Sequence, residues 1–380
     1  MFKKDNSIIF SHQNSPLPTK PTKEYFASLD GLRGISILLV FVSHYGFPLL
    51  PGAFGVTIFF FVSGFLISRL LQNELLSTGS ISLKNFYIRR VLRLAPALVF
   101  FVAFFGVLWW QLFTLFSFEA LFAAIFYYFN YFKLFVGDVF PPYNVLWSLA
   151  VEEHYYIIFP GLFLFIGGMT KNTVKIFIFF AGFILLWRFM LLHLISEQSI
   201  ALDYQYLKKS TDTRFDSILY GALLATMAFT SGANVFLEKL RTFSIAIVGG
   251  LIVIIGLSFK LPAFNQYEVI SELQYTLRYT LTGIGLLLVL NYILFAKTAT
   301  VFRTILSTPI LVYIGKLSYS IYLWHLATLV TAKKLYPQDI GISMYLICTV
   351  ITLIAALISY HFVELKFIKL RHKFGSNIMK

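Results

Sequence analysis

Long apolar stretches separated by short polar gaps occupy most of the chain between residues 35 and 363. The hydrocarbon core of a bilayer requires about 20 mainly apolar residues per helix. Eleven stretches are candidates for such helices: 35–50, 54–76, 95–116, 121–136, 146–166, 174–195, 218–229, 243–259, 273–295, 310–331 and 342–363. The pattern predicts an all-α, polytopic integral membrane protein.

The stretch 121–136 differs from the other ten. It is short, and it includes the polar or amphipathic residues Tyr127, Tyr128, Asn130, Tyr131 and Lys133. Such residues suit a re-entrant or interfacial segment better than a membrane span. We therefore expect about 10 transmembrane helices and one segment, 121–136, that does not cross the bilayer.

The positions of the basic residues support ten spans. Short cytoplasmic loops collect Lys and Arg. If the N-terminus is cytoplasmic and 121–136 does not cross, most of the 31 Lys and Arg residues face the cytoplasm, and the outer side keeps only Lys133, Lys208, Lys209, Lys260, Lys333 and Lys334. We expect a multi-pass protein of the inner (plasma) membrane with both termini in the cytoplasm.

The polar ends of the chain flank one membrane domain. Residues 1–28 lack the charged end, apolar run and cleavage site of a signal peptide, so we expect a cytoplasmic N-terminal tail. No fixed-period repeat or long low-complexity linker divides residues 29–368, and we assign them to a single membrane domain. Residues 369–380 then form a basic cytoplasmic tail.

Composition excludes several classes of protein. The chain is 58% hydrophobic and 13% charged, whereas soluble domains are about 45–50% apolar and about 25% charged, so a soluble enzyme with one anchor is excluded. The net charge of +14 does not indicate nucleic-acid binding, because the basic residues lie between apolar stretches. A single cysteine, Cys348, allows no internal disulfide and no cysteine-based zinc site. The chain has no Walker loop, which argues against a nucleotide-driven pump.

Three ionisable residues mark the first predicted span. An ionisable group inside a span costs at least a few kcal/mol unless it is paired or faces water, so it is a candidate for function. Arg33 and His44 lie eleven residues apart, which places them on one helix face roughly 16 Å from each other. Asp30 precedes them. The alternative interpretation is an interfacial arginine and a histidine that bonds to a neighbouring helix.

A second group begins the fifth predicted span. Ser148, Glu152, Glu153 and His154 lie on the side that the charge distribution makes extracytoplasmic. Adjacent acidic residues on a helix point about 100° apart, so at most one of them faces a given cavity. The alternative is a solvated helix N-terminus, where the macrodipole favours Glu.

Arg90 and Arg93 lie at positions i and i+3 of a basic stretch that leads into the third predicted span. Guanidinium groups bind phosphate well, either in a nucleotide-bearing cofactor or in a lipid headgroup. The alternative is therefore an orientation anchor that binds acidic lipids.

Two further pairs of polar residues lie in later spans. Arg214 and Asp216 begin the seventh predicted span. The alternative to a functional role is a structural ion pair between them. Tyr319 and His325 lie in the tenth, where His325 is also consistent with a satisfied structural histidine.

Taken together, these segments resemble the membrane acyltransferase-3 family from about Tyr25 to Glu364. The sequence departs from that family at two positions, because Ala327 and Lys366 stand where the family often has proline. The resemblance rests on six motifs in the order of the family: Arg33 with His44; Gly55-Val-Thr-Ile-Phe-Phe-Phe-Val-Ser63-Gly64; Arg90-x-x-Arg93; Trp147-Ser148-Leu149-x-x-Glu152; Arg214-x-Asp216 with Gly221; and Tyr319-x-x-Tyr322-Leu-x-His325.

The resemblance implies transfer of an acyl group, most often acetyl, from cytoplasmic acyl-CoA to a sugar on the far side of the membrane. Because a neutral hydroxyl is a poor nucleophile, such a reaction needs a base. His44 is our candidate for the base or for a transient acyl carrier, and Glu152 for a group that orients its imidazole or assists the proton transfer. Arg33, Arg90 and Arg93 are candidates for binding the thioester region or the phosphates of CoA. The remaining candidates, for substrate binding or for a structural polar role, are Asp30, Ser148, Arg214, Asp216, Tyr319 and His325.

The expected partners are the lipid bilayer, acyl-CoA as a co-substrate and an extracytoplasmic carbohydrate, with no tightly bound cofactor, no metal and no nucleic acid. Lipopolysaccharide, other envelope polysaccharides and small secreted sugars are all possible acceptors. About a dozen residues follow the membrane domain, so a separate soluble transferase, if needed, would be another chain. The alternative function is a transporter or flippase of a glycan or lipid precursor, which would also place charges along a polar path.

Overall fold

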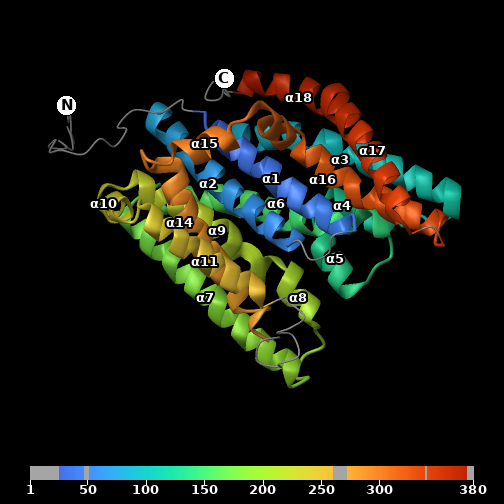
Figure 1. Cartoon of the computed structure of the whole chain (residues 1–380), viewed down its shortest axis with the longest axis horizontal. Coiled ribbons are helices and arrows are strands. Elements are labelled where there is room, and N and C mark those ends of the chain that lie inside the picture. The colour runs from blue at the N-terminus through green and yellow to red at the C-terminus, as the bar shows by residue number, and fades with distance from the viewer. Residues whose placement is uncertain (1–24, 47–50, 260–271, 339, 375–380) are drawn as a thin grey trace, which may run out of the picture.

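The computed structural model describes residues 25–46, 51–259, 272–338 and 340–374, and every regular element among them is a helix. Figure 1 shows α1 (Ala27–His44), α2 (Gly52–Thr78) and α16 (Pro309–Leu335) through the middle of the molecule. Most of the two predicted tails, residues 1–24 and 375–380, and the predicted outer residue Lys260 lie outside the described residues.

The other helices surround these three. In Figure 1, α7, α11 and α14 gather on one side, and α3 and α17 lie on the other. In chain order the surrounding elements are α3 (Leu83–Phe113), α4 (Phe118–Ile125), α5 (Phe129–Phe135), η1 (Pro141–Val145), α6 (Leu146–Ile166), α7 (Lys171–Ser196), α8 (Tyr204–Lys209), α9 (Thr211–Phe229), α10 (Ser231–Lys239), α11 (Phe243–Ser258), α14 (Leu277–Phe295), α15 (Thr300–Leu306), α17 (Ile342–Ile358), η2 (Ser359–Glu364), α18 (Leu365–Leu370) and η3 (Arg371–Phe374).

Seven helical segments of the described chain are long and apolar enough to cross a membrane. An eighth candidate is the pair Tyr204–Phe229 and Ser231–Lys239, which bends by 104° at the break. The seven are Ala27–His44, Gly52–Thr78, Leu83–Phe113, Pro141–Ile166, Lys171–Ser196, Leu277–Phe295 and Ile342–Leu370. These segments confirm the prediction of an all-helical membrane protein.

The remaining predicted spans fall on α9, α11 and α16. α9 is bent against α10, α11 has 16 residues, and α16 has 27 residues but carries Lys316, His325, Lys333 and Lys334. The total of about ten spans therefore stays a prediction.

The segment 121–136 forms two short helices rather than one span. α4 has 8 residues and α5 has 7, so each is roughly 12 Å long and cannot cross a bilayer core. Tyr127, between them, has a φ of 57°, which turns the chain. Asn130 is fully buried, and its amide donates to the Thr211 hydroxyl at 3.1 Å. The segment is thus fixed to the start of α9.

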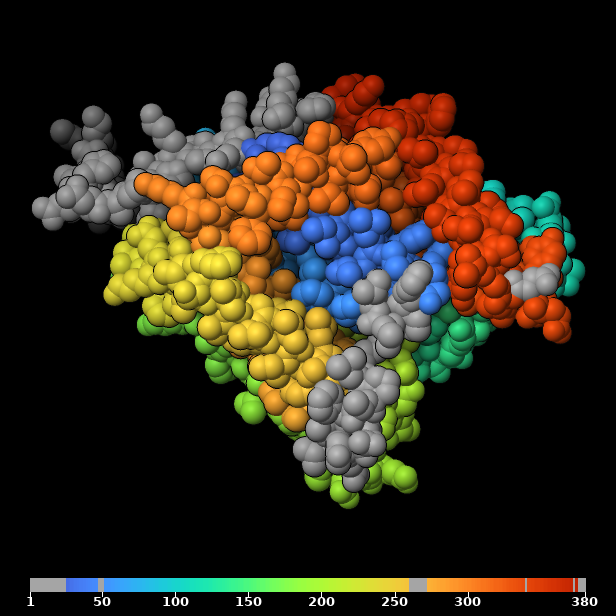
Figure 2. All heavy atoms as spheres, viewed as in Figure 1, coloured from blue at the N-terminus to red at the C-terminus, as the bar shows by residue number. Residues whose placement is uncertain are grey.

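Glycines allow the central helices to approach closely. A Cβ atom built at Gly221 of α9 would overlap the carbonyl oxygen of Phe61 on α2, and one built at Gly315 of α16 would overlap the carbonyl oxygen of Asp30 on α1. Small residues at such contacts are a common basis of helix packing in membranes. Figure 2 shows α1, in blue, between the orange α15–α16 segment and the red α17. This packing brings together the helices that carry the candidate site.

Gly221→Val should destabilise the protein, because the new side chain must separate α9 from α2. Overpacking of this kind typically costs about 1–3 kcal/mol, which thermal unfolding of the purified protein in detergent would detect. Gly182→Val in α7 is a matched control, since no atom lies within 4 Å of a Cβ built there. Equal losses of stability in the two variants would contradict the close α2–α9 contact.

Candidate active site

Two neighbouring cavities lie among α1, α2, α3 and α16. The wide cavity, of about 310 Å³, is lined by the start of α1, the end of α2 and the C-terminal residues up to Arg371. The narrow cavity, of about 90 Å³, extends further along α2 and α16, to Val56 and Tyr322. Arg33, Arg93 and Tyr319 line both cavities. The two cavities therefore adjoin each other.

Basic side chains outnumber acidic ones in the wide cavity. Asp30 accepts a hydrogen bond from the Tyr25 hydroxyl at 2.5 Å and lies 3.9 Å from Arg33. Burial raises the pKa of Tyr25, and donation to Asp30 raises it further, so Tyr25 remains a neutral donor. The charged residues of the lining are Arg33, Arg69, Arg93, Lys316 and Arg371 against Asp30 and Glu364.

The C-terminal arginine of this lining, Arg371, is partly buried and lies close to other guanidinium groups. Burial, followed by the neighbouring guanidinium groups of Arg90 and Arg89, lowers the pKa of Arg371. An anion bound in the wide cavity would stabilise the charged form of Arg371. The cavity thus suits a negatively charged ligand.

Arg90 and Arg93, which we expected to act together, have different surroundings. The Arg90 guanidinium lies 3.4 Å from Glu152 and 3.2 Å from Glu153, and it stacks 3.3 Å above the Tyr156 ring centroid. Arg93 has no carboxylate partner among the described residues, and it faces both cavities. Arg93 is therefore the better placed of the two for a phosphate.

Glu152 lies in the wall of the narrow cavity, six residues inside α6. It accepts short hydrogen bonds from the hydroxyls of Ser63 and Tyr156, in addition to its contact with Arg90. We expected Glu152 at an extracytoplasmic helix end, where it would orient His44. α6 has the predicted bounds, and within it the structure places Glu152 beside Arg90. The role of Glu152 in orienting His44 stays a prediction.

The imidazole beside His44 belongs to His325. His44 Nδ1 lies 3.1 Å from His325 Nε2, and the two rings stack with centroids 5.2 Å apart. His325 is fully buried, and its Nδ1 lies 2.7 Å from the carbonyl oxygen of Tyr322. The Tyr45 hydroxyl donates to the carbonyl oxygen of His325 at 2.7 Å. The two histidines that we singled out separately therefore form a pair.

These contacts assign the tautomers of the pair. A carbonyl oxygen only accepts, so His325 Nδ1 must carry a proton. In a neutral ring, His325 Nε2 then accepts, and His44 Nδ1 donates to it. The lone pair of a neutral His44 is consequently on Nε2.

Tyr322 connects the narrow cavity with the histidine pair. Its hydroxyl lies 2.6 Å from the Ser148 hydroxyl, and its ring centroid lies 5.5 Å from that of His325. Ser148 and Tyr322 both line the narrow cavity. Sequence reasoning assigned no role to Tyr322, although its spacing of three residues from His325 places both on one side of α16.

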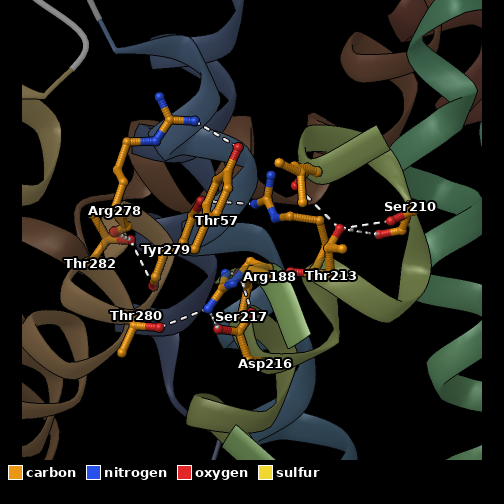
Figure 3. Close-up of polar contacts among 12 residues, drawn as sticks. Thr57, Arg188, Ser210, Thr213, Asp216, Ser217, Arg278, Tyr279, Thr280 and Thr282 are labelled. Carbon is orange, nitrogen blue, oxygen red and sulfur yellow. Dashed lines mark hydrogen bonds and ion pairs between the residues drawn. The ribbon is translucent and has the colours of Figure 1, made fainter. Parts of the chain in front are cut away.

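The candidates Arg214, Asp216 and Tyr319 have contacts that were not predicted. Asp216 pairs with Arg188 at 2.6 Å and not with Arg214, which corrects the ion pair expected between Arg214 and Asp216 (Figure 3). Side chains two residues apart on a helix do not face each other. The Tyr319 hydroxyl donates to the Leu94 carbonyl at 3.0 Å and lies between the two cavities.

The different surroundings of Arg90 and Arg93 predict different effects of the same substitution. Arg90→Gln leaves Glu152 and Glu153 buried without their cation and should cost about 3–5 kcal/mol of stability. Arg93→Gln breaks no ion pair among the described residues and should change the unfolding temperature little. Thermal unfolding of both variants checks this difference, and a larger loss in Arg93→Gln would contradict the assignment.

Comparison with known proteins identifies the family. The chain matches a family model described as an acyltransferase domain over residues 26–361. Two Staphylococcus aureus proteins provisionally named O-acetyltransferases, from strains COL and MSSA476, are each 33% identical over 360 residues, covering 91% of this chain and 58% of the relative. O-acetyltransferase OatA of Staphylococcus aureus strain NCTC 8325 / PS 47 is 32% identical over 90% of this chain and 57% of the relative.

This chain thus spans less than three fifths of the length of the relatives that it matches. No solved structure matches it significantly. The family match covers nearly all of the described residues, including the narrow cavity, most of the wide cavity and the histidine pair. The chain belongs to the membrane acyltransferase-3 family.

Proposed function

We propose that this protein is a membrane O-acyltransferase that moves an acyl group, acetyl foremost, from cytoplasmic acyl-CoA to a hydroxyl of an extracytoplasmic carbohydrate. The observation that carries the proposal is the arrangement along α1, with Arg33 in the basic cavities and His44 in the histidine pair. Eleven residues of helix separate the two by roughly 16 Å. The names of the relatives support an acetyl group and an oxygen acceptor.

The wide cavity is our proposed site for the phosphates of CoA. Arg33, Arg93 and Arg371 supply guanidinium groups, which bind phosphate through two parallel hydrogen bonds. The narrow cavity, at about 90 Å³, is too small for a nucleotide but suits a thin flexible chain. The acyl-bearing arm of CoA would extend through it toward Tyr322.

His44 is the proposed general base. Its Nε2 takes the proton of the acceptor hydroxyl while the hydroxyl oxygen attacks the thioester carbonyl carbon. The carbon–sulfur bond then breaks, and the proton passes from His44 to the departing CoA sulfur. His325 accepts from His44 Nδ1 and so holds the ring in the required tautomer. In the alternative role as an acyl carrier, His44 would use the same nitrogen.

The proposed orientation places the wide cavity in the cytoplasm. Lys316 and Arg371 line this cavity, and the positive-inside rule favours such residues on the cytoplasmic side. His44, at the opposite end of α1, then lies toward the extracytoplasmic side. We propose the inner membrane as the location.

A transporter or flippase is the alternative. It would require a path that opens past Tyr322, and it would not consume CoA. The hydrogen bond between Tyr322 and Ser148 and the paired imidazoles favour a chemical step at this position.

His44→Ala should abolish transfer of radioactive acetyl from acetyl-CoA to envelope carbohydrate, because the base is lost. General bases contribute about 100- to 10,000-fold in rate. The measurement compares membranes that contain equal amounts of wild type, His44→Ala and His193→Ala, whose histidine is exposed at the end of α7. CoA binding should persist in all three proteins.

Full transfer by His44→Ala would overturn the role of His44. Absence of CoA binding in the folded wild type would overturn the acyltransferase and favour the transporter.

A further inference from the structure

A second arginine cluster lies away from the two cavities, between α2, α7, α9 and α14. It consists of Arg188, Arg214 and Arg278, which are 0%, 2% and 6% exposed. Asp216 pairs with Arg188, which also donates to the Thr280 hydroxyl at 2.7 Å (Figure 3). One of the three positive charges is therefore neutralised.

Within the described part of the chain, the other two arginines have neutral partners only. Arg214 donates to the Thr57 hydroxyl at 3.3 Å and to the Lys208 carbonyl at 3.1 Å, and its Nε is buried without a hydrogen bond. Arg278 donates to the Tyr279 hydroxyl at 2.7 Å (Figure 3). Neither contacts a carboxylate among the described residues. Two buried cations without a counter-charge are costly inside a membrane bundle.

The Tyr279 ring lies between these two cations. The Arg214 guanidinium is 3.9 Å from its centroid and that of Arg278 is 4.7 Å away. Cation–π contacts compensate a buried charge only in part. Because the Tyr279 hydroxyl accepts from Arg278, its own proton is available for donation to a ligand.

A small cavity adjoins this cluster. It measures about 30 Å³ and is lined by Thr57, Arg278, Tyr279 and Thr282, with Pro51, Ala53, Phe54 and Leu257 as apolar neighbours. A water molecule needs at least about 10–15 Å³, so the cavity holds two or three water-sized groups. A carboxylate or the oxygens of one phosphate group would fit.

The small cavity lies at the opposite end of α2 from the wide cavity. A Cβ atom built at Gly52 would overlap the Ser43 hydroxyl, so the start of α2 packs against the residue before His44. Ala53 and Thr57 of α2 line the small cavity, whereas Arg69 and Asn73 of the same helix line the wide cavity. The cluster is thus on the side of the bundle that the proposed function gives to the acceptor.

We propose that Arg278, Arg214 and Tyr279 form an anion site that binds a carboxylate or phosphate group carried by the acceptor carbohydrate. This inference rests on the proposed function, because it assigns the ligand to the acceptor. The acceptor is then an acidic glycan, and the site holds it on the side of the bundle where His44 lies.

The test measures binding of D-glucuronate, glucose 6-phosphate and glucose to the purified full-length protein by calorimetry. We expect at least one charged sugar to bind more tightly than glucose, and the stronger of the two identifies the group as carboxylate or phosphate. Arg278→Gln should weaken that binding at least tenfold, and Arg278→Lys should weaken it less. Arg241→Gln, which removes an arginine beside Glu238, should leave it unchanged, whereas Arg93→Gln detects any binding in the wide cavity instead.

Equal binding of all three sugars, or loss of binding in Arg93→Gln rather than in Arg278→Gln, would overturn the anion site. Thermal unfolding of each unliganded variant confirms that it is folded. Transfer from acetyl-CoA is measured separately. Binding without any transfer would count against the acyltransferase alone, and transfer without charge-dependent sugar binding would count against the anion site alone.

Discussion

A cation inside a membrane bundle must meet an anion or water, and this constraint organises the polar interior of the protein. Some arginines meet carboxylates, as Arg188 does with Asp216 and Arg90 with Glu152 and Glu153. Arg93 instead faces a cavity without a carboxylate partner among the described residues. The paired arginines hold helices together, whereas those that face cavities remain available for anionic ligands.

Close helix packing determines where these ligands could react. α1 contacts α16 through Gly315, which aligns the two helices along their length. The same contact leaves the basic cavities near Arg33 and brings His44 to His325. In the proposed function, donor binding and proton transfer thus both depend on this helix pair, so a change in its packing would affect both.

The fold class and part of the site could be predicted from the sequence, because they depend on local features. Apolar stretch length predicted a helical membrane protein, and the spacing of Arg33 and His44 predicted that they share one helix face. The partner of His44 could not be predicted, since His325 is 281 residues away. Likewise, no local signal placed Glu152 beside Arg90 or Arg188 beside Asp216, because these contacts depend on how separate helices pack.

The central claim is that the protein joins a cytoplasmic donor to an acceptor on the other side of the membrane. Sealed inside-out vesicles test it most directly, because acetyl-CoA added outside reaches only the cytoplasmic face. Our account predicts that radioactive acetyl appears in carbohydrate enclosed within intact vesicles. Label that appears only after detergent opens the vesicles, or only in carbohydrate on their outer surface, would contradict it.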